Sequence, residues 1–171
     1  DSVKNSSQIT NAMNIVSSTK FKRFQVLTLK SRNYARAVNE AFDNLVASLT
    51  GNKFVIFDGK TEVKRVGIIV MTSDRRLESM KKEFQKEGKD VSVITIGRKA
   101  KEYCKNRDIN VDSEYTQMIP ETMFETGKKI SEDVVQFYLN DFYDEVYMIY
   151  SKFVSAVEYN IQVEKLLPIE K

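Results

Sequence analysis

Several residues that could bind a ligand follow the first strongly apolar stretch of the sequence. Thr72, Ser73, Asp74 and Arg75 stand at the end of the run 66–72, which has the near-continuous apolar character of a buried parallel strand. Hydroxyls, a carboxylate and a guanidinium at such a strand end could bind a phosphate or a metal ion. Ser73 or Asp74 could instead accept hydrogen bonds from the free N–H groups of a following helix. We favour this helix cap.

A second group of possible acid–base residues consists of Asp141, Asp144 and Glu145, at a predicted helix-to-strand turn. The sequence contains no histidine, which removes imidazole both as general base and as metal ligand. We therefore expect these carboxylates to be solvated turn residues. Cys104 is the single cysteine, so it excludes an intrachain disulfide and suits a reducing compartment. We expect its side chain to pack in the core beside Tyr103.

Motifs for binding nucleotide phosphates are missing. Neither G-x-G-x-x-G nor G-x-x-x-x-G-K-[ST] occurs, and the six glycines form no cluster that could surround a phosphate. A nucleotide-dependent enzyme is therefore disfavoured. The sequence predicts no catalytic residues, no cofactor-binding residues and no metal ligands in this chain.

Strands and helices alternate after Gly51, which is typical of an α/β fold with a mostly parallel, Rossmann-like sheet and flanking helices. The predicted strands are 66–72, 91–96, 145–150 and 160–167, with a short extended piece at 109–111. The predicted helices are 77–87, 99–106 and 120–142. The inner face of the last helix is expected to be Met123, Phe124, Ile130, Val134, Phe137 and Tyr138. The short connection between the last two strands leaves room for an antiparallel pair at one edge.

The first fifty residues contain neither glycine nor proline and predict one long helix that ends near Gly51. Such a helix would be roughly 70 Å long, about twice the width of a globular domain of this size. Its apolar seam repeats every three or four residues and needs a partner along its length. The seam comprises Ile9, Ala12, Met13, Val16, Lys20, Phe24, Leu27, Ser31, Tyr34, Ala35, Val38, Phe42, Leu45 and Leu49. We therefore predict two domains, a long coiled-coil helix at 1–51 and an α/β domain at 52–171, in a protein that belongs to an assembly.

Charge is distributed unevenly, although the net charge is only +3. Residues 2–39 include seven basic residues and no acidic one, which fits either a solvated helix face or a surface for an acidic partner. Nucleic acid is disfavoured, because no zinc-finger or RNP-like motif is present and the basic residues form no dense run. The longest apolar run, 66–72, is far shorter than the ~20 residues that span a bilayer, and no signal peptide is visible. Any contact with a membrane is expected to be indirect.

The sequence resembles the gamma subunit of F-type ATP synthase over most of its length. Residues 2–16, S-V-K-N-S-S-Q-I-T-N-A-M-N-I-V, and 20–25, K-F-K-R-F-Q, are similar to that family's opening helix, whose pattern is S-V-K-N-T-x-Q-I-T-K-A-M-x-M-V followed by K-L-x-x-A-Q. The segments 66–75, 145–155 and 163–168 resemble its first core strand and its late strands, in the family's order.

Four departures from the family pattern stand out. Asn11 replaces the usual lysine, and Ile15 replaces the usual methionine. The family's Gly-Leu-Cys-Gly after Ser-Asp-Arg is missing, because Arg76 follows Arg75 directly. The sequence ends at Lys171, where the family continues into a long C-terminal helix that winds antiparallel against the first. We therefore expect the sequence to be an incomplete record of a longer bacterial-type chain.

The resemblance implies the rotating central stalk that couples proton flow through the membrane ring to ATP synthesis or hydrolysis at the beta subunits, with no catalytic site of its own. The implied partners are the alpha and beta subunits, the epsilon subunit and the ring of c subunits, through which alone the chain meets the membrane at the cytoplasmic face of the bacterial cell. The implied interface residues are Ile9, Thr10, Met13, Val16, Lys20, Lys22 and Arg23. The alternative is a non-catalytic α/β interaction module with a dimerising helical arm.

Overall fold

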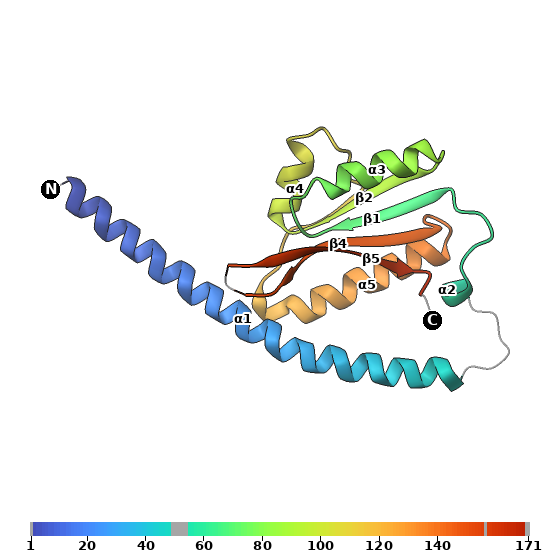
Figure 1. Ribbon diagram of the computed structural model, residues 1–171, viewed down its shortest axis with the longest axis horizontal. Helices are drawn as coiled ribbons and strands as arrows, with labels where there is room; N and C mark the ends of the chain where they lie inside the picture. Colours follow the sequence, from blue (N-terminus) through green and yellow to red (C-terminus); the bar gives the residue numbers. More distant parts are fainter. Residues whose placement is uncertain (1, 49–54, 156, 170–171) are drawn as a thin grey trace. The chain divides into compact units, whose positions relative to one another are not determined.

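The structure is a computed structural model that describes residues 2–48, 55–155 and 157–169 (Figure 1). The chain divides into two compact units, residues 1–52 and residues 53–171. The first unit contains a single long helix. The second is built from a five-stranded sheet and its flanking helices.

The long helix α1 (Ser2–Ser48) is continuous over 47 residues, which confirms the predicted helix. It is about 70 Å long at 1.5 Å per residue. The stop expected at Gly51 lies outside the described residues. The hydroxyls of Thr10, Thr19 and Thr28 each donate to the carbonyl four residues earlier, at 2.8–2.9 Å. Such bonds bend helices slightly, and α1 curves along its length in Figure 1.

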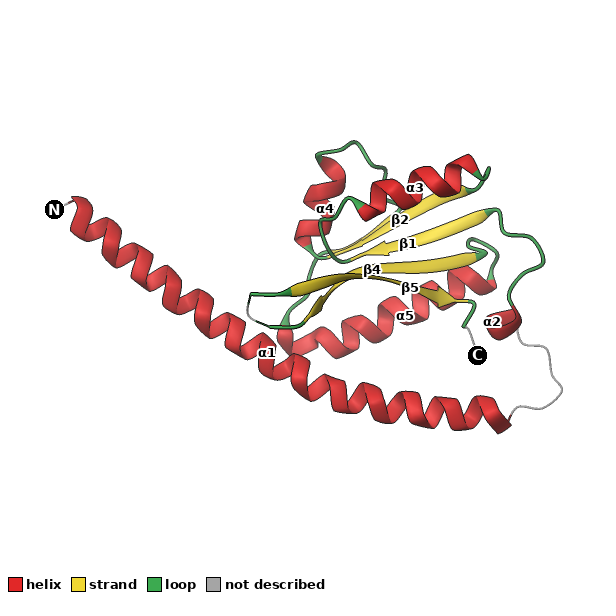
Figure 2. Ribbon diagram, in the orientation of Figure 1, coloured by secondary structure: helices red, strands yellow, loops and turns green. Residues whose placement is uncertain are grey.

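The sheet of the second unit has the order β3-β2-β1-β4-β5, in which β5 alone is antiparallel to its neighbour. The strands are β1 (Arg65–Val70), β2 (Asp90–Ile96), β3 (Ser113–Tyr115), β4 (Glu145–Phe153) and β5 (Tyr159–Leu167). The helices are α2 (Val55–Asp58), α3 (Arg76–Lys86), α4 (Arg98–Lys105), the short 3-10 turn η1 (Pro120–Thr122) and α5 (Met123–Leu139) (Figure 2). The predicted α/β sheet is confirmed, including its antiparallel edge pair.

Helices cover both faces of this sheet, so each face has its own core. Alternate side chains of the strands pack with α3 and α4 on one face, where Leu77, Ala100 and Cys104 are fully buried. The other face packs against α5 through Ile130, Val134 and Tyr138. Cys104 is therefore core packing, as predicted.

The close packing of β1 against the start of β4 requires a glycine. A Cβ added at Gly67 would lie 3.1 Å from the ring of Tyr143, which is itself buried. Few real Cβ contacts are this short, so a larger residue at this position would have to displace the buried ring by a few tenths of an ångström.

Three expectations about the elements of this unit were wrong. The third strand is Ser113–Tyr115 rather than 109–111, because pairing with β2 begins only at Asp112, whose N–H donates to the carbonyl of Val93 at 2.8 Å. Phe124, expected on the inner face of α5, is 64% exposed. The helix α5 also ends at Leu139, before the predicted 142, and Asp141 then takes a positive φ of 61°.

Candidate interaction surface on the long helix

Many of the described apolar side chains of α1 lie exposed within this chain, although Leu27 of the seam is half-buried. Ile9 is 62% exposed, Met13 65% and Val16 53%, and the seam residues Tyr34 and Val38 are about half exposed further along. A shallow apolar hollow runs along the helix between Ile9 and Val16. Its lining is Ile9, Ala12, Met13, Val16 and Ser17. Large side chains exposed along one stripe of a helix mark a contact surface for another element.

Helical geometry brings some of the predicted interface residues together and separates others. Ile9, Met13, Val16 and Lys20 are spaced by four, three and four residues, which places them on one face of α1. Lys22 is nine residues from Met13 and therefore lies about 180° around the helix from it. Thr10 and Arg23 lie at the edges of the apolar face by the same calculation. A single flat partner could not contact all seven residues, whereas partners on several sides of the helix could.

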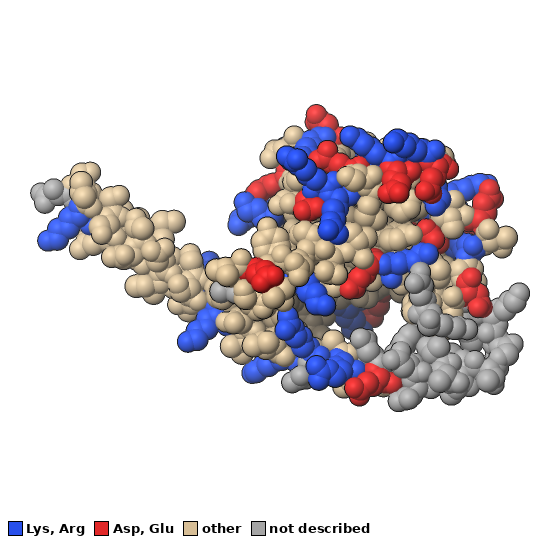
Figure 3. All heavy atoms as spheres, in the orientation of Figure 1, with Lys and Arg blue, Asp and Glu red and all other residues tan. Residues whose placement is uncertain are grey.

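Charged groups on this part of α1 are few, and all of them are basic. Lys20, Lys22 and Arg23 are exposed, and the only hydroxyl among the predicted interface residues, that of Thr10, donates to Ser6 within the helix at 2.9 Å. In Figure 3 the end of α1 nearest the N-terminus presents mainly uncharged atoms with isolated basic side chains. The surface therefore combines apolar contact area with a positive charge that is unbalanced between residues 2 and 39.

The ligand loop considered after β1 is a helix cap. The Asp74 carboxylate accepts the N–H of Arg76 at 2.8 Å, and its backbone carbonyl accepts the N–H of Leu77 at 3.3 Å. Thr72 accepts a hydrogen bond from the hydroxyl of Ser151 at 2.9 Å. These groups serve the start of α3 and the neighbouring strand, as the cap interpretation predicted.

The carboxylates at the start of β4 are not the solvated turn residues that we expected. Asp144 is 4% exposed, and its Oδ2 accepts the N–H groups of Lys64 at 2.9 Å and Arg65 at 2.8 Å. Burial by itself raises the pKa of this carboxyl, but the two N–H groups and the nearby Lys60 ammonium outweigh burial and lower the pKa below 3.8. Glu145 is also mostly buried and pairs with Lys165 at 2.9 Å. Asp141 alone is solvated, with 72% of its side chain exposed.

No sequence signal marked Asp144 as buried, because its partners lie about eighty residues away. Register explains its position: β1 and β4 pair from Val66 and Glu145 onward, so Asp144 lies opposite the N–H groups that precede β1. An acidic residue just before a strand, beside a predicted parallel neighbour, is the only hint that the sequence offers. The arrangement holds two strand ends together and engages both oxygens of the Asp144 carboxylate.

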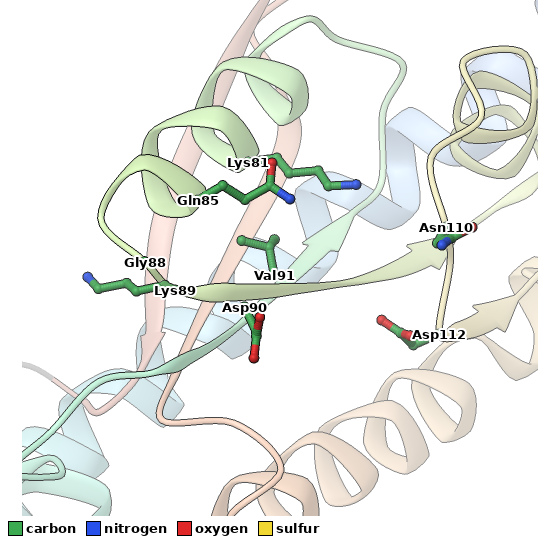
Figure 4. A pocket seen from close by; sticks show the side chains of 8 residues that line it. All are labelled: Lys81, Gln85, Gly88, Lys89, Asp90, Val91, Asn110 and Asp112. Atoms are coloured by element: carbon green, nitrogen blue, oxygen red, sulfur yellow. The ribbon is translucent and has the colours of Figure 1, made fainter.

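Two hollows lined by described residues of the α/β unit contain no converging chemical groups. One of about 530 Å³ lies near the start of β2 (Figure 4). In Figure 4, Lys81 and Gln85 lie on one side of the β2 strand, whereas Asp90 and Asp112 lie on the other. A second hollow of about 680 Å³, beside α4, is basic, but its Lys101 is paired with Glu114. Neither hollow directs unpaired groups at one point.

The described ranges 2–48, 55–155 and 157–169 contain no group of three or more Cys, Asp or Glu side chains that could hold a metal ion. None of the helices within those ranges has both the length and the hydropathy to cross a membrane.

Known proteins resemble this chain along its whole length. A family model described as ATP synthase matches residues 1–171. The ATP synthase gamma chain of Fusobacterium nucleatum is 39% identical over 180 residues, which cover 99% of this chain and 64% of that protein. The gamma chain of Trichlorobacter lovleyi is 34% identical over 181 residues, covering 99% of this chain and 62% of that one. The chain thus spans just under two thirds of the length of these relatives.

A solved structure gives a weaker likeness. A chain in the central stalk and c-ring structure of the Tetrahymena thermophila mitochondrial ATP synthase matches with a TM-score of 0.45 and 23% identity, over 64% of this chain and 52% of that chain. A likeness at this level adds nothing to the match of the family model and of the bacterial relatives. On the strength of those matches, the chain belongs to the ATP synthase gamma chain family.

Proposed function

We propose that this chain is part of the rotating central stalk of an F-type ATP synthase, which couples proton flow to ATP synthesis or hydrolysis in the beta subunits. Residues 1–51 act as one strand of the shaft, and residues 52–171 as its α/β domain. The chain carries no catalytic site, and the chemistry belongs to its partners. The exposed apolar seam of a 47-residue helix is the observation that carries this proposal, because it requires a long partner.

The seam pairs with a second helix in an antiparallel coiled coil, and a C-terminal segment beyond Lys171 supplies that helix. The faces of α1 that the coiled coil leaves open meet the alpha and beta subunits. The placement of Met13 and Lys22 on opposite sides of α1 favours this arrangement, since a shaft enclosed by a ring is contacted from several directions. The epsilon subunit and the c ring are the proposed partners of the α/β domain. Through the ring, the chain is associated peripherally with the cytoplasmic face of the bacterial membrane.

A rotating shaft must be stiff and must release each contact in turn. An unbroken two-stranded helix supplies stiffness. Apolar side chains such as Ile9 and Val16 make no directional polar contacts that would hold one orientation. The exposed cations Lys20, Lys22 and Arg23 can pair with acidic groups of the beta subunits at only ~0–1 kcal/mol each, which is weak enough to exchange during rotation. Different contacts with each beta subunit shift the relative energies of their states.

Charge reversal at the basic contact segment tests the proposal. In the assembled complex, the triple variant Lys20→Glu, Lys22→Glu, Arg23→Glu is expected to lower proton pumping per ATP hydrolysed. The fold should hardly change, since exposed substitutions usually stay within ~0.5 kcal/mol. The matched control is Lys4→Glu, Lys30→Glu, Arg36→Glu, which makes the same change in charge at three other exposed positions of α1. Unchanged pumping per ATP in the first variant, or an equal loss in both, contradicts the assigned contact.

A further inference from the structure

Lys60 is a buried cation with an unusually complete set of partners, none of which the proposed function uses. Its side chain is 13% exposed. Its Nζ donates to the carbonyl of Tyr143 at 2.6 Å and pairs with Asp141 at 2.8 Å and Asp144 at 3.3 Å. It also lies 4.8 Å from the ring centre of Tyr138. These partners come from the end of α5 and the turn into β4, about eighty residues further along the chain.

The short helix α2, directly before Lys60, is held at two further points. The hydroxyl of Tyr138 donates to the carbonyl of Val55 at 3.0 Å. The N–H of Ile169 donates to the carbonyl of Ile56 at 2.7 Å. A four-residue helix has no stability of its own, so these contacts determine where it lies. Figure 1 shows α2 beside the end of β5.

The contact with Ile169 links two parts of the chain that are far apart in sequence. Ile56 belongs to the segment that enters the α/β unit, and Ile169 follows the last strand, β5. Gly59 lies against the residue before Ile169. A Cβ added at Gly59 would lie 3.1 Å from Cγ of Pro168, so the lack of a side chain lets the two segments come this close. The chain therefore enters the unit and leaves its last strand at one place, next to the start of β4.

We propose that these contacts form a junction anchor, which fixes the entering and leaving segments of the α/β unit to each other and to the sheet, so that a turning force on this unit is carried into both segments together. The junction anchor comprises Lys60, Tyr138, Asp141, Tyr143 and Asp144, together with the contacts of Val55, Ile56, Gly59, Pro168 and Ile169. The mechanical role of the junction anchor rests on the proposed central-stalk function. The contacts that make up the anchor do not depend on that function.

Burial gives the junction anchor its strength. An exposed ion pair contributes little and opens easily, as for Lys64 and Glu62, whose side chains are 66% and 71% exposed. Lys60 and Asp144 are both shielded from water, so removing either partner leaves an uncompensated buried charge. The carboxylate of Asp144 also accepts the N–H groups of Lys64 and Arg65, so the same group holds the ammonium and the start of β1. Loss of the Lys60 ammonium therefore loosens the start of β1 as well, through Asp144.

Hydrogen exchange on the full chain tests whether the anchor exists. Lys60→Met keeps an unbranched side chain, one atom shorter, and removes its charge. The amides of Lys64, Arg65 and Ile169 are expected to exchange about tenfold faster, while those of Ile68 and Ile94 in the sheet centre change less than about twofold. The matched control, Lys64→Met, removes the same charge from an exposed pair and should leave the amide of Ile169 and the amides of the sheet centre unchanged. Unchanged exchange in Lys60→Met, or the same acceleration in the control, overturns the anchor.

A second variant keeps the test decisive if Lys60→Met does not fold. Tyr138→Phe removes only the hydroxyl that holds Val55. It is expected to accelerate exchange at Gly59, whose N–H donates to Val55 within α2, and at Ile169, but not at Lys64 or Arg65. Unchanged exchange at both Gly59 and Ile169 overturns the proposed fixing of α2.

The mechanical role requires a measurement in the assembled complex. With the catalytic hexamer fixed and a bead attached to the α/β unit, Lys60→Met is expected to widen the angular fluctuations of the bead about each resting position, while Lys64→Met leaves them unchanged. If the wild-type complex turns and the Lys60→Met fluctuations are unchanged, the anchor proposal fails alone. If the wild-type complex hydrolyses ATP without turning the bead, the proposed function itself fails.

Discussion

Asp144→Asn should destabilise the α/β unit, because it replaces one oxygen of a buried carboxylate by an amino group. The carboxylate is 4% exposed, accepts the N–H groups of Lys64 and Arg65 at Oδ2, and faces the Lys60 ammonium with Oδ1. An asparagine amide has one acceptor oxygen instead of two, so either the backbone N–H groups or the ammonium must face an amino group. Removing one partner of a buried ion pair costs about 3–5 kcal/mol. Because Lys60 keeps Asp141 and the carbonyl of Tyr143, we expect a loss near the low end, about 3 kcal/mol.

Urea denaturation, monitored by tyrosine fluorescence, measures the loss in the free energy of unfolding of the α/β unit. The chain has eight tyrosines, and only Tyr34 lies in residues 1–52, so the other seven report on residues 53–171. The control is Asp141→Asn, which removes the carboxylate 2.8 Å from the same ammonium but at a 72% exposed position. We expect its loss to stay within about 1 kcal/mol.

The pH dependence separates a charge effect from a packing effect. Because the pKa of Asp144 is lowered in the folded state, its contribution is present above its ordinary value of 3.8 and disappears as pH falls through the lower folded value. The difference between wild type and Asp144→Asn should therefore be full at pH 7 and shrink below pH 3.8. A loss under about 0.5 kcal/mol at pH 7, or a difference that persists unchanged in acid, refutes the reasoning.

Two further predictions concern the sheet. Burial, together with hydrogen bonds to Asp133 and Glu164, raises the pKa values of Tyr115 and Tyr150 to about 12, so the unit should be stable up to pH 10 and lose stability as pH rises toward about 12. Absorbance titration with Tyr115→Phe and Tyr150→Phe difference curves checks this, and ionisation of both phenols near pH 10 would contradict it. Gly67→Ala, whose Cβ would lie 3.1 Å from the Tyr143 ring, should cost about 1–3 kcal/mol. Gly127→Ala, with open space around it in α5, should gain up to about 1 kcal/mol in the same denaturation assay, and equal effects at the two glycines would disprove the steric argument.

Local pattern was sufficient for most of the fold. The helix α1 followed from an unbroken helical period without glycine or proline, and β1, β2 and β4 from short apolar runs between turn signals. The strand β3 was missed because its residues, Ser113, Glu114 and Tyr115, carry no apolar run, and their pairing with β2 is a long-range contact. Phe124 was misplaced because the helical period alone does not say where a helix leaves the sheet it covers.

The site shows the same division between local and long-range information. The exposed seam of α1, with Ile9, Met13 and Val16, is visible in the spacing of the residues alone. The burial of Asp144 and Lys60 depends on contacts between segments about eighty residues apart, and no short motif reports such contacts. The absence of histidine had favoured solvated residues at this turn, and a charged residue is rarely buried unless it is paired. The sequence did not show that Lys60 is the pairing partner of Asp144.

Direct observation of rotation tests the central claim most directly. The full-length chain would be assembled with its alpha and beta partners, the hexamer fixed to a surface, and a bead attached to the α/β unit at Lys99, whose side chain is 79% exposed on α4. On addition of ATP, the central-stalk account predicts stepwise rotation of the bead in one direction, at a rate that follows ATP hydrolysis. A bead that stays still while the same complexes hydrolyse ATP at the full rate would contradict the account.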